Sequence, residues 1–294
     1  MNFVCPRCKG ELTFEAPDQL RCQKEALTFR QMDGIWRFLL PERESYYSLF
    51  IEEYEKVRHF EGRFSADAAY YRGLPFKDLS GRFSSDWKIR AKSFEVLSKL
   101  LQTPSKIIDL GAGNGWLSNR LTEFGHEVFA IDLLTNSEDG LGAWRYYETK
   151  FASLQAEFSF LPFSTAVADV LIFNASLHYA ENYDQVLTEV LRVLKPDGVL
   201  IVMDSPIYHD GASGREMLAE RKMQFQTRYG FSSDSLQSEG FLTYHRMEEL
   251  GKSLGVYWKH IIPNYGWKWL LRPFLARLRG KREPAQFGLW VGKR

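Results

Sequence analysis

The segment Asp109-Leu-Gly-Ala-Gly-Asn-Gly115 places three glycines directly behind an apolar run and an aspartate. Glycines in a turn from a strand to a helix let backbone amides approach a bound ligand closely. Asp132 ends the next apolar run, where a carboxylate can accept hydrogen bonds from both hydroxyls of a ribose. A helix cap or turn acid is the other interpretation of Asp132. The spacing predicts a nucleoside-binding site.

The residue after this loop narrows the choice of nucleoside. A dinucleotide fingerprint has its third glycine at position 116, where it lets the helix pack closely on the strand. This chain has Trp116 there. The sequence therefore disfavours NAD.

The three cysteines of the chain, Cys5, Cys8 and Cys22, all lie near its start. A pair of cysteines two residues apart forms one half of a tetrahedral zinc site, and a second pair normally closes it. Glu25 stands where the fourth cysteine would be. We predict a zinc-ribbon-like unit in which Glu25 completes the site. The alternative is a degenerate ribbon without metal, held by a small core of its own.

The elements that position these residues alternate between apolar strands and helices. We expect strands at 106–110, 127–132, 167–173 and 198–203, and helices at 115–124, 141–152 and 182–194. Short strands without polar alternation, separated by helices, indicate a parallel sheet covered on both faces. The predicted fold is a doubly wound α/β sheet.

Three regions follow from this pattern. Residues 1–40 contain short strand-like runs and form the ribbon, and residues 41–104 form a helical segment and cap. Residues 105–294 form the main domain, which a helical insertion at 205–242 interrupts after the fifth strand. Thr243 is the expected N-cap of the next helix.

Residues 85–204 resemble the class I S-adenosylmethionine-dependent methyltransferases of the type 11 kind, which have a Rossmann-like sheet. Besides the glycine loop and Asp132, Glu157-Phe-Ser-Phe-Leu-Pro-Phe163 keeps the family's spacing of an acid before Leu-Pro-Phe. Residues 169–179 resemble the fourth strand and the loop that faces the methyl group, and residues 191–202 resemble the helix, turn and fifth strand. Asp197 departs from the family, which more often has glycine in that turn. The resemblance implies S-adenosylmethionine as cofactor.

The resemblance also assigns site residues. Glu157 would accept from the adenine amino group and the Phe158 amide would donate to the ring. His178, after the fourth strand, is the candidate base if the acceptor is a hydroxyl or phenol, or else a partly buried structural histidine. The predicted cofactor-binding residues are Asp109, Gly111, Ala112, Gly113, Gly115, Asp132, Leu133, Glu157, Phe158 and Asn174, and the predicted substrate residues are Tyr179, Tyr208, Arg215 and Arg221.

The composition bears on the acceptor. With 38 Lys+Arg against 37 Asp+Glu, the net charge of +1 provides no global attraction to nucleic acid or anionic membranes. We therefore predict a small-molecule acceptor. The ribbon also resembles that of the bacterial 23S ribosomal RNA guanine-N1 methyltransferases, so an rRNA or tRNA base methyltransferase is the alternative. A non-catalytic module that binds S-adenosylmethionine or a partner is the second alternative.

Two further expectations concern location and surface. No apolar run approaches the roughly 18 residues of a transmembrane helix and no signal peptide is visible, so we expect a cytoplasmic protein. Residues 267–282 alternate basic with aromatic and aliphatic side chains. A solvated helix face is the expectation for this stretch, and contact with lipid, an anionic substrate or RNA is the alternative.

Overall fold

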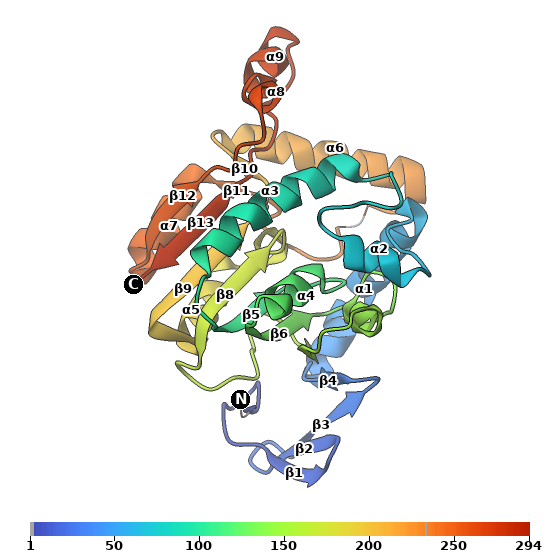
Figure 1. Ribbon diagram of the computed structural model, residues 1–294, viewed down its shortest axis with the longest axis vertical. Helices are drawn as coiled ribbons and strands as arrows, with labels where there is room; N and C mark the ends of the chain where they lie inside the picture. Colours follow the sequence, from blue (N-terminus) through green and yellow to red (C-terminus); the bar gives the residue numbers. More distant parts are fainter. Residues whose placement is uncertain (1–2, 233) are drawn as a thin grey trace.

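The computed structural model describes residues 3–232 and 234–294. Within them, one mixed sheet has the strand order β1-β2-β3-β4-β7-β6-β5-β8-β9-β13-β12, and β10 pairs with β11 separately (Figure 1). The strands are β1 (Thr13–Ala16), β2 (Gln19–Cys22), β3 (Leu27–Met32), β4 (Ile35–Arg37), β5 (Lys106–Leu110), β6 (Glu127–Asp132), β7 (Ala152–Gln155), β8 (Ala168–Asn174), β9 (Leu194–Met203), β10 (Ile207–Tyr208), β11 (Leu242–Thr243), β12 (Tyr257–Ile261) and β13 (Leu289–Lys293).

Strands β7, β6, β5, β8 and β9 are parallel, and β13 is antiparallel to both of its neighbours. The helices are α1 (Pro41–Glu61), α2 (Ala68–Gly73), α3 (Ser84–Leu100), α4 (Trp116–Glu123), α5 (Tyr183–Val193), α6 (Gly211–Tyr229), α7 (Tyr244–Leu254), α8 (Trp267–Leu270) and α9 (Arg272–Leu278), with 3-10 turns η1 (Leu141–Tyr146) and η2 (Leu177–Tyr179). The predicted doubly wound α/β fold is confirmed.

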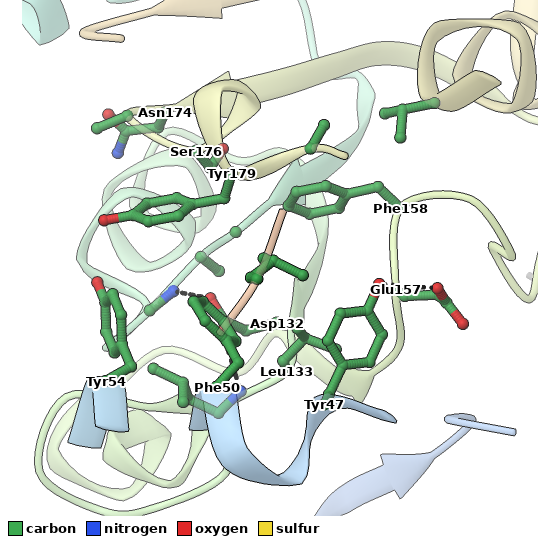
Figure 2. A pocket seen from close by; sticks show the side chains of 18 of the residues that line it. Tyr47, Phe50, Tyr54, Asp132, Leu133, Glu157, Phe158, Asn174, Ser176 and Tyr179 are labelled. Carbon is green, nitrogen blue, oxygen red and sulfur yellow. Dashed lines mark hydrogen bonds between the residues drawn. The ribbon is translucent and has the colours of Figure 1, made fainter. Parts of the chain in front are cut away.

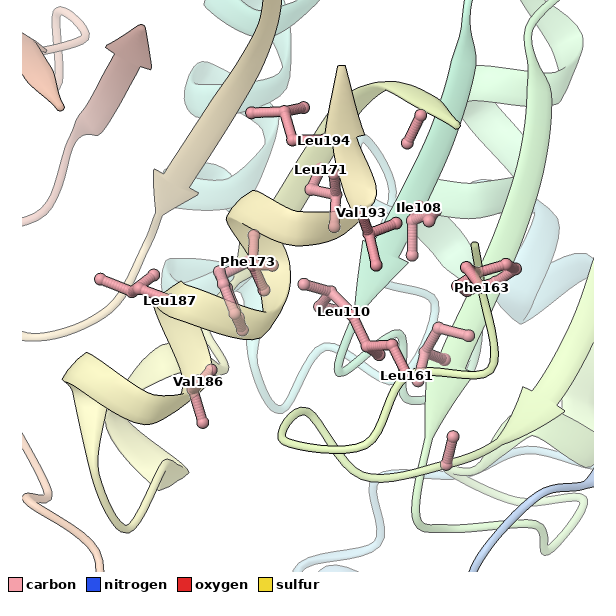
Figure 3. Close-up of a cluster of buried hydrophobic side chains, with 14 of the residues drawn as sticks. Ile108, Leu110, Leu161, Phe163, Leu171, Phe173, Val186, Leu187, Val193 and Leu194 are labelled. Atoms are coloured by element: carbon pink, nitrogen blue, oxygen red, sulfur yellow. The ribbon is translucent and has the colours of Figure 1, made fainter. Parts of the chain in front are cut away.

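Both faces of the parallel strands are buried, which is why these strands lack polar alternation. In β5, Ile108 and Leu110 join the cluster under α5 and α7, whereas Ile107 joins the cluster under α3 and α4. Figure 3 shows the first cluster, in which Val186 and Leu187 of α5 lie near Phe173 of the sheet. The apolar run of each strand thus serves two cores at once.

The ribbon continues the main sheet. Its last strand, β4, pairs in parallel with β7, so that Trp36 lies opposite Leu154. Trp36 and Phe38 belong to the same buried cluster as Leu154 and Phe163. The core of the ribbon is therefore shared with the main domain. The predicted boundary at residue 40 falls between β4 and α1, and the one at 104 falls between α3 and β5.

The predicted helix over 141–152 is wrong: only the 3-10 turn η1 forms there. The segment before it is a tight loop, because the Asn136 side-chain oxygen accepts from the backbone amides of residues 138–140. Strand β7, which the sequence pattern did not indicate, begins at Ala152, where the expected helix was to end. The expected N-cap is confirmed, since Thr243 Oγ1 accepts from the Arg246 amide at 3.0 Å.

Candidate functional site

A cavity of about 410 Å³ lies where the parallel strands β5, β6 and β8 end (Figure 2). This is the edge at which open α/β sheets bind ligands. The predicted cofactor residues that line it are Gly111, Ala112, Gly113, Asp132, Leu133, Glu157, Phe158 and Asn174, and of the predicted substrate residues Tyr179 does so.

The glycine loop needs glycine for steric reasons at its first and last positions. Gly111 has φ +75°, and a Cβ there would stand 2.3 Å from Cβ of Ser176, in the loop after β8. Gly115 has φ +77° and precedes α4, and a Cβ there would meet Phe151 at 2.9 Å. Side chains at Gly111 and Gly115 would therefore collide with neighbouring residues, and the glycines let the backbone of the loop run along the cavity.

Asp132 is held in place by two backbone amides at the end of β6. Its Oδ2 accepts from Gly113 at 2.7 Å and its Oδ1 accepts from Leu134 at 2.8 Å. Each carboxylate oxygen keeps a further acceptor position. Burial raises the pKa of Asp132 to about 6, although these amides favour the ionised form. The carboxylate is oriented by the loop and borders the cavity.

This pKa predicts a pH dependence of cofactor affinity. A carboxylate whose pKa is raised to about 6 loses its charge as the pH falls through that value, and the protonated acid accepts hydrogen bonds less well. We expect S-adenosylmethionine to bind about tenfold more weakly at pH 5 than at pH 7. Titration calorimetry across this range checks the expectation. In an Asp132→Asn variant the dependence should vanish, and a wild-type affinity that is flat with pH would contradict the assignment.

Asp109 and Gly115 do not line the cavity. The Asp109 carboxylate is fully buried, its Oδ2 accepts from Ser118 Oγ at 2.7 Å, and its Oδ1 has no hydrogen-bond partner within the described residues. Burial raises its pKa to about 7. Asp109 thus joins the end of β5 to the start of α4 beneath the loop. Its carboxylate does not reach the cavity in which we predicted it to contact the cofactor.

Helix α1, from the segment 41–104 that we expected to be a helical cap, forms the wall opposite the strand ends. Figure 2 shows Tyr47, Phe50 and Tyr54 of α1 projecting toward the side that holds Phe158 and Tyr179. Arg43 links α1 to the segment after β7, because its Nε donates to both carboxylate oxygens of Glu157 at 2.9 Å. The cavity is therefore a pocket roofed by aromatic side chains.

Glu157 lies in the cavity wall as predicted, but its carboxylate is already engaged. Besides Arg43, the Tyr47 hydroxyl donates to its Oε2 at 3.0 Å. Burial raises the pKa of Glu157, while Arg43 opposes that shift. An adenine amino group would have to share this carboxylate with Arg43 and Tyr47.

Among the polar groups at the cavity, the Arg90 guanidinium and the Asn174 side-chain oxygen have no partner within residues 3–232 and 234–294. Arg90 of α3 lines it, with its guanidinium 4.7 Å from the centre of the Trp87 ring and no hydrogen bond or ion pair within the described chain. Burial, together with the nearby Arg58, lowers its pKa. The side-chain oxygen of Asn174 is buried and also unpaired. A buried oxygen without a partner, such as that of Asn174, is costly unless a ligand satisfies it, and the half-buried Arg90 guanidinium lies in the same cavity.

His178 and three predicted substrate residues lie outside the cavity lining. His178 Nδ1 is 3.3 Å from Ser205 Oγ, and burial lowers the pKa of His178 to about 3, with Arg221 and Arg90 adding to the shift. Tyr208 is buried against Phe241. From the insertion at 205–242, Leu236 lines the cavity, whereas Tyr208, Arg215 and Arg221 do not. The cavity is thus covered mainly by α1 and not by the insertion.

The cysteines converge in the ribbon. Their Sγ atoms all lie within 4.8 Å of one another, and those of Cys8 and Cys22 are 3.6 Å apart. The structure does not bring Glu25 into this cluster, because its carboxylate pairs with Arg7 at 3.6 Å. Its backbone amide instead faces the Cys22 Sγ at 3.4 Å. Three thiols are in place for a metal and the predicted fourth ligand is not.

The fold and the cavity define a nucleoside-binding α/β protein. Residues 108–202 match the family described as "Methyltransferase domain". Among curated proteins, the chain is 29% identical over 98 residues to malonyl-[acyl-carrier protein] O-methyltransferase of Buchnera aphidicola, covering 32% of this chain and 37% of that protein. It is 32% identical over 149 residues to demethylmenaquinone methyltransferase of Thermus thermophilus, covering 48% of this chain and 66% of that protein.

Solved structures agree on the fold. The YcgJ protein of Bacillus subtilis superposes with a TM-score of 0.51 at 15% identity, covering 69% of this chain and 99% of that chain. A putative sarcosine dimethylglycine methyltransferase of Galdieria sulphuraria also gives 0.51, at 16% identity, over 82% and 97%. Residues 108–202 therefore form a methyltransferase domain of the S-adenosylmethionine-dependent kind, and S-adenosylmethionine is the cofactor of that family. The similar segment spans between 36% and 41% of the three malonyl-[acyl-carrier protein] O-methyltransferases compared.

Proposed function

We propose that this protein transfers a methyl group from S-adenosylmethionine to a small-molecule acceptor. The observation that carries the proposal is a cavity that combines an oriented carboxylate with an unpaired cation and an unpaired amide oxygen. S-adenosylmethionine offers the matching groups: ribose hydroxyls, a carboxylate and an ammonium. NAD has no free amino-acid group that could pair with Arg90 and Asn174.

Each part of the cofactor has candidate partners in this chain. Asp132 would accept from the ribose hydroxyls, and Phe158 and Leu133 would hold the adenine ring between apolar surfaces. Arg90 would pair with the carboxylate, and the Asn174 oxygen would accept from the ammonium. The glycine loop leaves room for the part of the cofactor that joins the ribose to its amino-acid group.

When bound, the cofactor's sulfonium supplies an electrophilic methyl group. The protein's own contribution is positioning, because transfer requires the nucleophile in line with the carbon–sulfur bond. Phe50 and Tyr54 of α1 face Tyr179 of η2 in the aromatic part of the cavity, where the ring centres of Tyr54 and Tyr179 are 5.9 Å apart. We assign the acceptor to this aromatic part of the cavity, which excludes water from the reacting atoms.

His178 has no part in the proposed chemistry. A base with a pKa near 3 has little proton affinity at neutral pH, and His178 lies outside the cavity lining. The proposal therefore favours acceptors that react without a strong protein base.

A small acceptor is supported by the near-zero net charge and by the printed names of relatives, which include a demethylmenaquinone and a sterol methyltransferase. The test measures S-adenosylhomocysteine formed with panels of phenols, quinols, carboxylic acids and amines, and separately with total RNA. We expect one small-molecule class to raise turnover above the blank. Turnover stimulated by RNA alone would overturn the proposal, and cofactor binding without turnover on any acceptor would favour the non-catalytic alternative.

We further propose that Cys5, Cys8 and Cys22 hold a structural zinc ion, since three converging thiols are the ligands that zinc prefers. Elemental analysis of the purified protein should find about one zinc per chain, and Cys8→Ser should lower that content severalfold. Because the Glu25 carboxylate points to Arg7, Glu25→Gln should retain the metal. Metal-free wild type would contradict the proposal, and loss of zinc in Glu25→Gln would restore Glu25 as a ligand.

A further inference from the structure

Residues 264–282 connect β12 to β13 and carry the helices α8 and α9. Figure 1 shows both helices projecting beyond α6, at the end of the molecule opposite the N-terminal ribbon. Neither helix has a buried residue. We call residues 264–282 the projection.

The projection exposes large apolar side chains. The exposed fractions are 68% for Trp267, 75% for Leu270, 60% for Phe274 and 68% for Leu278. Leu271 and Leu275 are exposed as well. Apolar side chains gathered on one protruding element differ from the scattered exposed residues of an ordinary surface, and such patches mark interaction sites.

The charge of the projection is one-sided. It contains no acidic residue, and its cations are Lys268, Arg272, Arg277, Arg279, Lys281 and Arg282. The whole chain is nearly neutral, so this cationic excess is local. Arg282 is offset by Glu220 of α6, at 2.9 Å. Arg277, Arg279 and Lys281 are exposed and make no ion pair with the described part of the chain.

We propose that the projection docks the protein on an anionic lipid bilayer. Exposed tryptophan, phenylalanine and leucine would enter the boundary between headgroups and acyl chains, and the surrounding arginines and lysines would meet anionic headgroups. Among the described residues, no helix is long and apolar enough to cross a membrane, so the contact would be interfacial. RNA fits less well, because its phosphates offer no apolar surface that could bury the exposed leucine side chains.

The base of the projection is fixed to the edge of the sheet that binds the cofactor. The Tyr265 hydroxyl lies 3.1 Å from Ser93 Oγ, which donates to Asp204 at 2.6 Å. Asp204 directly follows β9, and β9 is paired so that Met203 lies beside Asn174. Docking through the projection would therefore hold this edge in a defined orientation to the bilayer, which suits a lipophilic acceptor.

The test is flotation of the full chain with vesicles, without cofactor or acceptor, so its outcome is independent of the proposed reaction. We expect binding to phosphatidylcholine vesicles that contain about one third phosphatidylglycerol, and little binding to pure phosphatidylcholine. Raising the ionic strength should weaken it. A Trp267→Ala/Leu270→Ala variant should bind at least about tenfold more weakly. Phe14→Ala is the matched control, because Phe14 is 69% exposed but lies in the ribbon.

Charge reversal provides the second arm. Arg277→Glu/Arg279→Glu should lose the preference for anionic vesicles, whereas Lys24→Glu/Arg30→Glu, an equal change of net charge among exposed residues of the ribbon, should keep it. Equal binding by all variants, or no vesicle binding by wild type, would overturn the proposal. The proposal would also be overturned if the protein formed oligomers without vesicles and the Trp267→Ala/Leu270→Ala variant only made it monomeric. Binding of RNA but not of vesicles would overturn it as well.

Discussion

An Asp132→Ala variant is expected to bind S-adenosylmethionine about 100-fold more weakly than wild type. Alanine removes the acceptor for two ribose hydroxyls, and hydrogen bonds to a charged group contribute about 1.5 kcal/mol or more each. Two such bonds correspond to about two orders of magnitude in Kd. Titration calorimetry with S-adenosylmethionine and S-adenosylhomocysteine measures the effect.

A second carboxylate provides the control for the loss of charge. Asp169 is the second residue of β8, at the opposite edge of the sheet, and pairs with Lys195 at 2.6 Å. Asp169→Ala should leave cofactor affinity within about twofold of wild type. Since Asp132 also holds the amides of Gly113 and Leu134, thermal unfolding of each variant is followed in parallel. Unchanged affinity in folded Asp132→Ala would refute the ribose assignment.

An Arg90→Met variant is expected to lose about 30-fold in affinity for S-adenosylmethionine while binding 5′-methylthioadenosine like wild type. The second ligand lacks the amino-acid group, so the removed cation has nothing to pair with in it. Methionine keeps an unbranched apolar stem beside Trp87, which limits the loss of packing. Competition calorimetry with both ligands gives the two constants.

The two variants should differ in how they affect S-adenosylmethionine and 5′-methylthioadenosine. Asp132→Ala should weaken both ligands alike, because both carry the ribose, whereas Arg90→Met should discriminate between them. Lys88→Met changes an exposed cation two residues earlier on α3 and serves as the matched control. Equal weakening of the two ligands by Arg90→Met would show a general loss of structure and would remove Arg90 from the carboxylate site.

Much of the cofactor site could be predicted from the sequence because its parts are local. The glycine loop follows β5 and Asp132 ends β6, and strand ends meet at one edge in this fold. These strands were visible as apolar runs because both of their faces are buried, whereas β7 was not visible and Phe158 was assigned from the family resemblance. The roles of these residues in binding stay predictions, although the cavity gathers them.

Arg90 and Arg43 could not be found in this way. They belong to α3 and α1, which precede the first strand of the parallel sheet, and only the packing of these helices over the strand ends brings them to the cavity. Their sequence surroundings are those of ordinary exposed helical arginines. No pattern within either helix shows that one pairs with Glu157 and that the other has no partner within the described chain.

The direction of neighbouring side chains was also undetermined. His178 and Tyr179 are adjacent in η2, yet Tyr179 lines the cavity and His178 lies against Ser205. A short 3-10 turn sends successive side chains to different sides, and the sequence does not set the rotation of the turn about its axis. The direction of the Glu25 side chain was undetermined in the same way: its position in the sequence suits zinc, and in the structure its carboxylate pairs with Arg7.

The sequence by itself therefore determined the class of fold, four of the five parallel strands from β5 to β9, the glycine loop and the cluster of three cysteines. These features depend on residue types at short spacings, which act through backbone conformation and local burial. The tertiary structure decided that the ribbon joins the main sheet at β7, which side chains of α1 line the cavity and that Arg90 lines it too. These depend on contacts between segments distant in the chain, whose geometry is set by the packing of the whole molecule.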